Sequence, residues 1–175
     1  MNGINETVKA CTNLGISLEK LVANVAIFAC PKDVNNIVHN YGDARMYTNV
    51  RRKRNKENRR TFINDDYVDD NTLVNRSFKR GFKPQTFEEY HVCHIWDLVH
   101  DVKYFSEVRN LVLIPSGIHA LSDHNKSIID ILRYRAWDLY HWAPNGKAPG
   151  RPTNYPLPSD WAPCLPFSLS AQIRK

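Results

Sequence analysis

Hydrophobic side chains recur at helical spacing in three parts of the chain. The first two segments are short neighbours: residues 17–28, and residues 31–41, which open at Pro31 and stop at Gly42. The third segment, residues 125–141, is longer, and its apolar stripe consists of Ile128, Leu132, Ala136 and Leu139. We therefore predict a pair of short helices near the N-terminus and one longer helix in the second half.

The centre of the chain has the pattern of two strands. Residues 90–97, YHVCHIWD, alternate between apolar and polar positions, whereas residues 109–115, RNLVLIP, form a continuous apolar run closed by a proline. Residues 116–125, SGIHALSDHN, follow with the character of a helix start, in which Ser116 can act as the cap. The order strand, loop, strand, helix predicts an α+β fold.

Three further segments lack a clear period. Residues 64–71 are acidic and turn-forming, and residues 76–84, RSFKRGFKP, combine basic residues with two phenylalanines that fit either base stacking or a core. We predict loops or edge strands for both. Seven of the ten prolines lie in residues 144–166, so we expect an extended tail that wraps over the body, anchored by Tyr155 and Trp161.

The size of the chain fits one domain. We divide its 175 residues into a helical part (1–50), a basic segment (51–87), a central core (88–125), and a supporting helix with a proline-rich tail (126–175). The longest apolar stretch, residues 21–30, is about half of the ~20 residues that a membrane helix needs. No secretion signal is visible, so we expect a cytoplasmic protein with reduced thiols and no membrane contact.

Positive charge is concentrated in one run, RRKRNKENRR at residues 51–60. The net charge of the chain is +6, and this run alone holds seven basic residues and one acidic residue. The basic residues are Arg51, Arg52, Lys53, Arg54, Lys56, Arg59 and Arg60. Clustered cations release counterions from nucleic acid, so we interpret the run as a phosphate-contacting segment. A solvated loop or helix face is the alternative interpretation.

Candidate chemistry lies in the central core. Six of the seven histidines fall in residues 91–141. His94 lies on the first predicted strand, Asn110 opens the second, and His119 and Asp123 are one helical turn apart. An imidazole and a carboxylate on one helical face can hold a divalent ion, and a second imidazole can take a proton from water. These residues predict a hydrolytic metal site. Capping of the following helix is the alternative role for Asp123.

This pattern resembles a known family. His94, Asn110 and His119 look like the signature of HNH nucleases, which have a ββα-metal fold and cut DNA with one divalent metal ion. The nine-residue step and its apolar context, NLVLIPSGIH, correspond to NLVLLCxxCH in the family. The resemblance covers about residues 88–125. It implies that His94 is the general base, that Asn110 orients it or approaches the metal, and that His119 and Asp123 bind the metal.

Two positions depart from the family pattern. Cys93 stands where the family usually has an Asp, His or Glu metal ligand, and His91, on the same face of the strand, is the alternative ligand. A thiolate suits zinc better than magnesium. We therefore expect one divalent metal ion, with Mg²⁺ as the main candidate. Because Cys93 could supply a thiolate ligand, Mn²⁺, Ni²⁺ and Zn²⁺ are the alternatives. Pro115 and Ile118 replace the CxxC of zinc-containing members, so no structural zinc is expected.

Together these observations predict a metal-dependent endonuclease that hydrolyses double-stranded DNA. The resemblance implies a restriction-type or other defence nuclease, or a nuclease of a phage or mobile element. Two alternatives remain open: a non-catalytic DNA-binding protein that uses the basic run, and a zinc-binding interaction module. Double-strand cleavage at a palindromic target would require a homodimer, and the sequence leaves the oligomeric state open.

Overall fold

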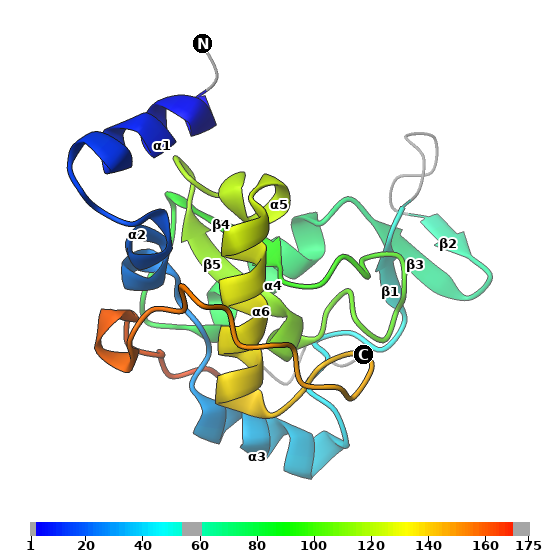
Figure 1. Cartoon of the computed structure of the whole chain (residues 1–175). Coiled ribbons are helices and arrows are strands. Elements are labelled where there is room, and N and C mark those ends of the chain that lie inside the picture. Colours follow the sequence, from blue (N-terminus) through cyan, green and yellow to red (C-terminus); the bar gives the residue numbers. More distant parts are fainter. Residues whose placement is uncertain (1–2, 54–60, 170–175) are drawn as a thin grey trace.

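The computed structural model describes residues 3–53 and 61–169, which form six α-helices and two small sheets (Figure 1). The helices are α1 (Gly3–Asn13), α2 (Leu18–Val25), α3 (Pro31–Tyr41), α4 (Thr72–Gly81), α5 (Leu121–His124) and α6 (Lys126–Tyr140), with the short 3₁₀ helices η1 (Val108–Asn110) and η2 (Pro158–Asp160). The strands are β1 (Val50–Arg52), β2 (Thr61–Ile63), β3 (Asp66–Asp69), β4 (Tyr90–His94) and β5 (Leu111–Pro115). The predicted α+β class is confirmed.

The three predicted helices are present, and their ends follow from local chemistry. The Ser17 hydroxyl accepts a hydrogen bond from the backbone N–H of Lys20 (3.1 Å) and caps α2. Gly42 ends α3 in the left-handed conformation (φ 82°), which costs a glycine little. The Asn125 side chain accepts from the N–H of Ile128 (3.2 Å) and caps α6.

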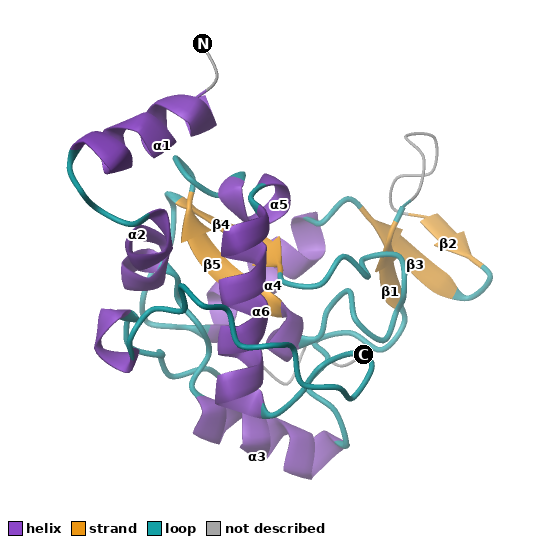
Figure 2. Ribbon diagram, viewed as in Figure 1, coloured by secondary structure: helices purple, strands orange, loops and turns teal. Residues whose placement is uncertain are grey.

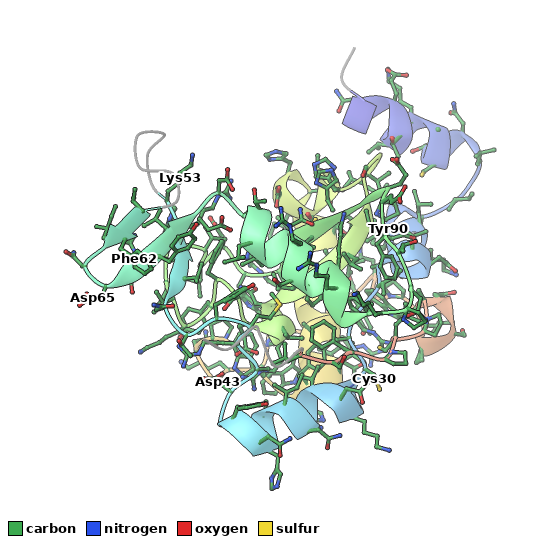
Figure 3. All side chains as sticks on the ribbon, turned by 180° about the vertical axis from the view of Figure 1, so that it is seen from behind. Cys30, Asp43, Lys53, Phe62, Asp65 and Tyr90 are labelled. Atoms are coloured by element: carbon green, nitrogen blue, oxygen red, sulfur yellow. The ribbon has the colours of Figure 1, made fainter. Side chains whose placement is uncertain are left out.

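The two predicted central strands pair with each other. β4 and β5 are antiparallel, with Cys93 opposite Val112 and His94 opposite Leu111. Figures 1 and 3, seen from opposite sides, place α6 on one side of this strand pair and α4 on the other. In the second sheet, which Figure 2 shows at one edge of the molecule, β3 pairs in parallel with β1 and antiparallel with β2.

Two predictions about the segment 64–84 are wrong. Residues 64–71 contain β3, which is the central strand of its sheet and not an edge strand. Residues 76–81 are helical and belong to α4. The helical conformation places the apolar side chains of this segment on the face that packs against the core. Phe78 and Phe82 are fully buried, with ring centroids 5.1 Å apart, so the two phenylalanines belong to the core and are closed to base stacking.

The proline-rich tail is extended, as predicted, and has only η2 as regular structure within residues 144–166. Trp161 anchors it: the side chain is 6% exposed and its ring lies 6.1 Å from that of Phe28, edge to face. Tyr155, the second predicted anchor, lies 5.7 Å from the Trp161 ring. The backbone N–H of Leu165 donates to the Phe28 carbonyl (3.0 Å). The tail therefore completes the core.

The tail also closes the core over α4. Phe167 is 4% exposed and packs on Phe78 and Phe82, with ring centroids 5.4 and 5.1 Å away. Gly81 lies directly beneath the Phe167 ring, where a methyl group would overlap the ring atoms.

Within the described part of the chain, no helix combines the length and apolar character needed to cross a bilayer.

Candidate functional site

The predicted chemical residues gather around one cavity of about 340 Å³ beside β4 and α5. Its walls come from β4 and the loop that follows it, from the turn before α5 and α5 itself, and from residues of β1, the start of α4 and α6. The cavity is lined by His91, Cys93, His94, His119 and Asp123, among others. Five of the six residues predicted for catalysis and metal binding therefore share one cavity. Asn110, the sixth, is fully buried outside it.

His94 ends β4 and is held by the backbone of the following loop. Its Nε2 lies 2.9 Å from the Phe105 carbonyl oxygen, and its ring stacks on the Phe105 ring at 5.4 Å. A carbonyl only accepts, so Nε2 carries the proton and Nδ1 keeps a lone pair. Burial lowers the pKa of His94 to about 4, which keeps the ring neutral near pH 7. The neutral ring therefore leaves Nδ1 unprotonated at neutral pH.

Asn110 holds both ends of the loop that positions His94. Its side-chain oxygen accepts from the N–H of Trp96 (2.8 Å), and its amide nitrogen donates to the Tyr104 carbonyl (3.0 Å). The next residue after Tyr104 is Phe105, whose carbonyl binds His94. Asn110 therefore acts on His94 through the loop backbone, and no hydrogen bond joins the two side chains among the described contacts.

His119 lies in a turn and not on a helix, which corrects the predicted helix start at Ser116. Residues 116–120 form turns and α5 begins only at Leu121. Two hydrogen bonds hold His119 in this turn. Its ring Nδ1 donates to the Ser116 carbonyl (2.7 Å), and its backbone carbonyl accepts from the Ser122 hydroxyl (2.7 Å). This arrangement leaves Nε2 of His119 with its lone pair.

His91 and His119 form a stacked pair at the cavity. Their ring centroids are 4.1 Å apart and the rings are nearly parallel, at 11°. Burial lowers the pKa of His91, and electrostatic interactions with His119 and Lys79 lower it further. The neutral form of the His91 ring is favoured, which is the form that binds metals.

Cys93 and Asp123 differ in their readiness to bind a cation. Cys93 is 6% exposed, and burial raises the pKa of its thiol to about 11, so the thiol stays protonated at neutral pH. Asp123 lies on α5 and faces the cavity. The predicted alternative for Asp123, capping the next helix, is wrong because Asn125 caps α6.

The donor chemistry fits a divalent ion, but the side chains do not converge on one point. A histidine that binds metal usually donates its other ring N–H to a carbonyl or carboxylate, and His119 does so to Ser116. Within residues 3–53 and 61–169, no three His, Cys, Asp or Glu side chains are grouped closely enough to hold a metal ion. His119, Asp123 and His91 line the cavity without forming a closed cage.

The basic run is described only in part. Arg51 forms an ion pair with Asp66, with Nε 2.9 Å from Oδ2, so its charge is partly neutralised. Arg52 lines the cavity, and the backbone N–H of Lys53 donates to the Asp69 carbonyl (3.1 Å). The other predicted phosphate contacts lie outside the described residues: Arg54, Lys56, Arg59 and Arg60.

Sequence reasoning did not place one cation, Arg133, at the site. This arginine projects from α6, lines the cavity, and donates from Nε to the Ile95 carbonyl (3.2 Å). The only signal in the sequence is its position off the apolar stripe of that helix. Together with Arg52 it places two guanidinium groups at the cavity that holds His94.

Comparison of the chain with protein-family models, with curated proteins and with solved structures gives no match. The function is therefore inferred from the chemistry of the cavity.

Proposed function

We propose that this protein is a metal-dependent endonuclease that hydrolyses phosphodiester bonds in double-stranded DNA, with its active site in the cavity beside β4 and α5. One observation carries the proposal: His94, whose Nδ1 carries no proton, shares this cavity with His119 and Asp123. The order of the β4–β5 pair and α5, together with the Asn110 to His119 step, is similar to the ββα-metal site of HNH nucleases.

In this proposal His94 is the general base. Its neutral ring accepts a proton from water through Nδ1, while the Phe105 carbonyl fixes the tautomer at Nε2. Asn110 is a positioning residue, because it holds the loop that presents that carbonyl. The guanidinium groups of Arg52 and Arg133 hold the phosphate at the cavity, since guanidinium matches the geometry of phosphate oxygens.

The metal would be held by His119 through Nε2, by Asp123, and by His91 in place of Cys93. His91 is the better ligand because its ring favours the neutral form, whereas the Cys93 thiol is buried and protonated. A bound divalent ion supplies positive charge that stabilises the phosphate and the leaving oxygen. Mg²⁺ is the first expectation, and the two imidazoles extend the range to Mn²⁺, Ni²⁺ and Zn²⁺.

Plasmid cleavage tests the catalytic role of His94. Supercoiled plasmid is incubated with the protein in chelator and then in each metal, beside His94→Ala and the control His39→Ala, an exposed histidine on α3. We expect metal-dependent cutting that falls by about 10²–10⁴-fold in His94→Ala, because a general base contributes that much. Cutting by His94→Ala at the wild-type rate contradicts the assignment. DNA binding without cutting in any metal contradicts the enzyme.

Metal-dependent stabilisation tests the ligands separately from activity. A ligand that binds only the folded state raises the melting temperature, and the rise grows with the logarithm of the ratio of ligand concentration to Kd. We expect Mn²⁺ to raise the melting temperature of the wild type and of Cys93→Ala, and to have little effect on His119→Ala and a reduced effect on His91→Ala. An equal rise in His119→Ala contradicts the proposed metal site. A rise lost in Cys93→Ala assigns the ligand to Cys93.

The resemblance to HNH nucleases supports a restriction-type or other defence role. Discrete fragments from genomic DNA would indicate a specific target sequence, and a smear would contradict restriction-type recognition. Double-strand breaks at a palindrome require two active sites related by a two-fold axis, so the oligomeric state should be measured with the same preparation.

A further inference from the structure

The outer face of α4 carries a continuous line of positive charge. We call it the α4 stripe, and it consists of Arg76, Lys79, Arg80 and Lys83. Arg76, Lys79 and Arg80 are spaced by three and four residues and lie on one face of α4, whereas Lys83 lies in the turn that follows, two residues after Gly81. At 1.5 Å per residue the stripe extends over about 10 Å.

The core explains why these side chains point outward. Val74, Ser77 and Phe78 occupy the opposite face of α4 and are buried. Arg76, Arg80 and Lys83 are exposed and Lys79 is half-buried. The ion pairs found in the described part of the chain include none of the four, so their charges face solvent.

A groove of about 590 Å³ runs along the end of the stripe. It is formed by Lys79, Arg80 and Lys83 on one side and by residues 84–88 on the other. One carboxylate, Glu88, lines the same groove, so three positive groups face one negative group. The exposed lining of the groove is mostly apolar, so the charged ends of these three side chains, and not the floor of the groove, are the part that suits a polyanion.

The stripe lies next to the candidate active site. α4 packs on β4, and Figure 3 shows α4 in front of the strand pair, with Tyr90 at the start of β4. Asn71, which precedes α4, lines the cavity. The positive charge of Lys79 acts on His91, which also lines it. The helix that carries the stripe therefore borders the cavity, and Lys79 is the stripe residue whose charge reaches it.

We propose that the α4 stripe binds the phosphate backbone of double-stranded DNA and guides it to the cavity; this inference rests on the proposed function. Each strand of a duplex carries one phosphate per ~3.4 Å of axis, so a stripe of about 10 Å covers roughly three phosphates. Contacts of this kind position the duplex and carry no sequence information.

The test compares two variants of equal net charge. The stripe variant is Arg76→Gln/Arg80→Gln/Lys83→Gln, which leaves Lys79 beside His91 unchanged. The control is Lys9→Gln/Lys32→Gln/Lys147→Gln, which removes three exposed lysines from α1, α3 and the tail. Binding of a duplex DNA of defined length is measured in chelator at several salt concentrations, so that no cleavage occurs.

We expect the stripe variant to bind at least about tenfold more weakly than the control, with a salt slope smaller by roughly 0.9 for each lost phosphate contact. Arg76→Lys/Arg80→Lys keeps the charge and should bind like the wild type. Equal binding by the stripe variant and the control overturns the inference. Tighter binding of an RNA duplex of the same sequence overturns the choice of DNA.

The outcome is separate from that of the proposed enzyme. If DNA binding depends on the stripe but the protein cuts DNA in no metal, the proposed nuclease is refuted and the proposed binding surface stands. Normal cutting together with unchanged binding by the stripe variant refutes the binding surface and keeps the nuclease.

Discussion

At the scale of single residues, Asn110 is expected to matter to a histidine that it does not touch. Asn110→Ala leaves the Trp96 N–H and the Tyr104 carbonyl without their partner, which costs about 1–3 kcal/mol of unfolding free energy. The loop then loosens and the Phe105 carbonyl moves relative to His94. Denaturant unfolding should show the loss of stability, and plasmid cleavage should fall while DNA binding is retained.

The matched control for this prediction is Asn35→Ala, an exposed asparagine on α3. A surface change of this type stays within about 0.5 kcal/mol of the wild type. Wild-type stability and cleavage in Asn110→Ala would contradict the positioning role.

The sequence predicted which candidate residues lie together but not their hydrogen-bond partners. The spacing of His94 and His119 and their places on neighbouring predicted elements were enough to put both at one cavity. Their partners are the backbone carbonyls of Phe105 and Ser116. Every residue has a carbonyl, so side-chain identity gives no signal for which one a ring nitrogen will meet; the path of the loop decides it.

At the scale of elements, Gly81 fixes the contact between α4 and the tail. Gly81→Ala places a methyl group against the Phe167 ring, which is packed between Phe78 and Phe82 and has little room to move. We expect a loss of about 1–3 kcal/mol, the usual cost of overpacking. The midpoint of urea unfolding measures it.

Gly117→Ala is the control for this substitution, because nothing lies within 4 Å of the position that its Cβ would take. Phe167→Leu in the Gly81→Ala background should recover part of the loss by making room. A stability loss in Gly117→Ala as large as that in Gly81→Ala would contradict the steric explanation.

Periodicity predicted the elements whose apolar faces are long and regular: α2, α3, α6, β4 and β5. It failed for α4, where the phenylalanines in RSFKRGFKP are covered by Phe167, more than 80 positions further along the chain. It also failed for β1, a strand of three residues that pairs in parallel with β3. Three residues are too few to show the alternation of apolar and polar side chains that indicates a strand, and the pairing of β1 depends on distant segments.

At the scale of the whole molecule, Glu19 joins three segments that are far apart in the sequence. The Ser127 hydroxyl of α6 and the Asn154 amide of the tail both donate to its carboxylate on α2. Burial alone would raise the pKa of Glu19, but hydrogen bonds from Ser127, from its own backbone, from Ser17 and from Asn154 together outweigh burial and hold the pKa below its ordinary value of 4.5.

This shift predicts a defined loss of stability in acid. A depressed pKa means that the folded state binds fewer protons, so the contribution of Glu19 is complete above pH 4.5 and is lost as the pH falls through the lower folded value. Glu19→Gln should therefore be less stable than the wild type at neutral pH and lose less on acidification. Melting temperatures from pH 7 to pH 3 measure both effects.

Ser127→Ala in the Glu19→Gln background should leave the shape of that pH curve unchanged, because the ionised partner is already absent. Parallel curves for Glu19→Gln and the wild type would contradict the assignment of the acid loss to Glu19.

The closure of the core by the tail has a consequence for synthesis on the ribosome. The backbone N–H of Phe167 donates to the Asp33 carboxylate across 134 positions of sequence, and Leu165 pairs with the backbone beside Phe28. At about 5–20 residues per second, the helices α2 and α3 emerge roughly 7–27 s before the residues that cover them. For that interval the apolar surface around Phe28 lacks the cover that the tail provides, so we expect the nascent chain to bind chaperones that recognise exposed apolar surface.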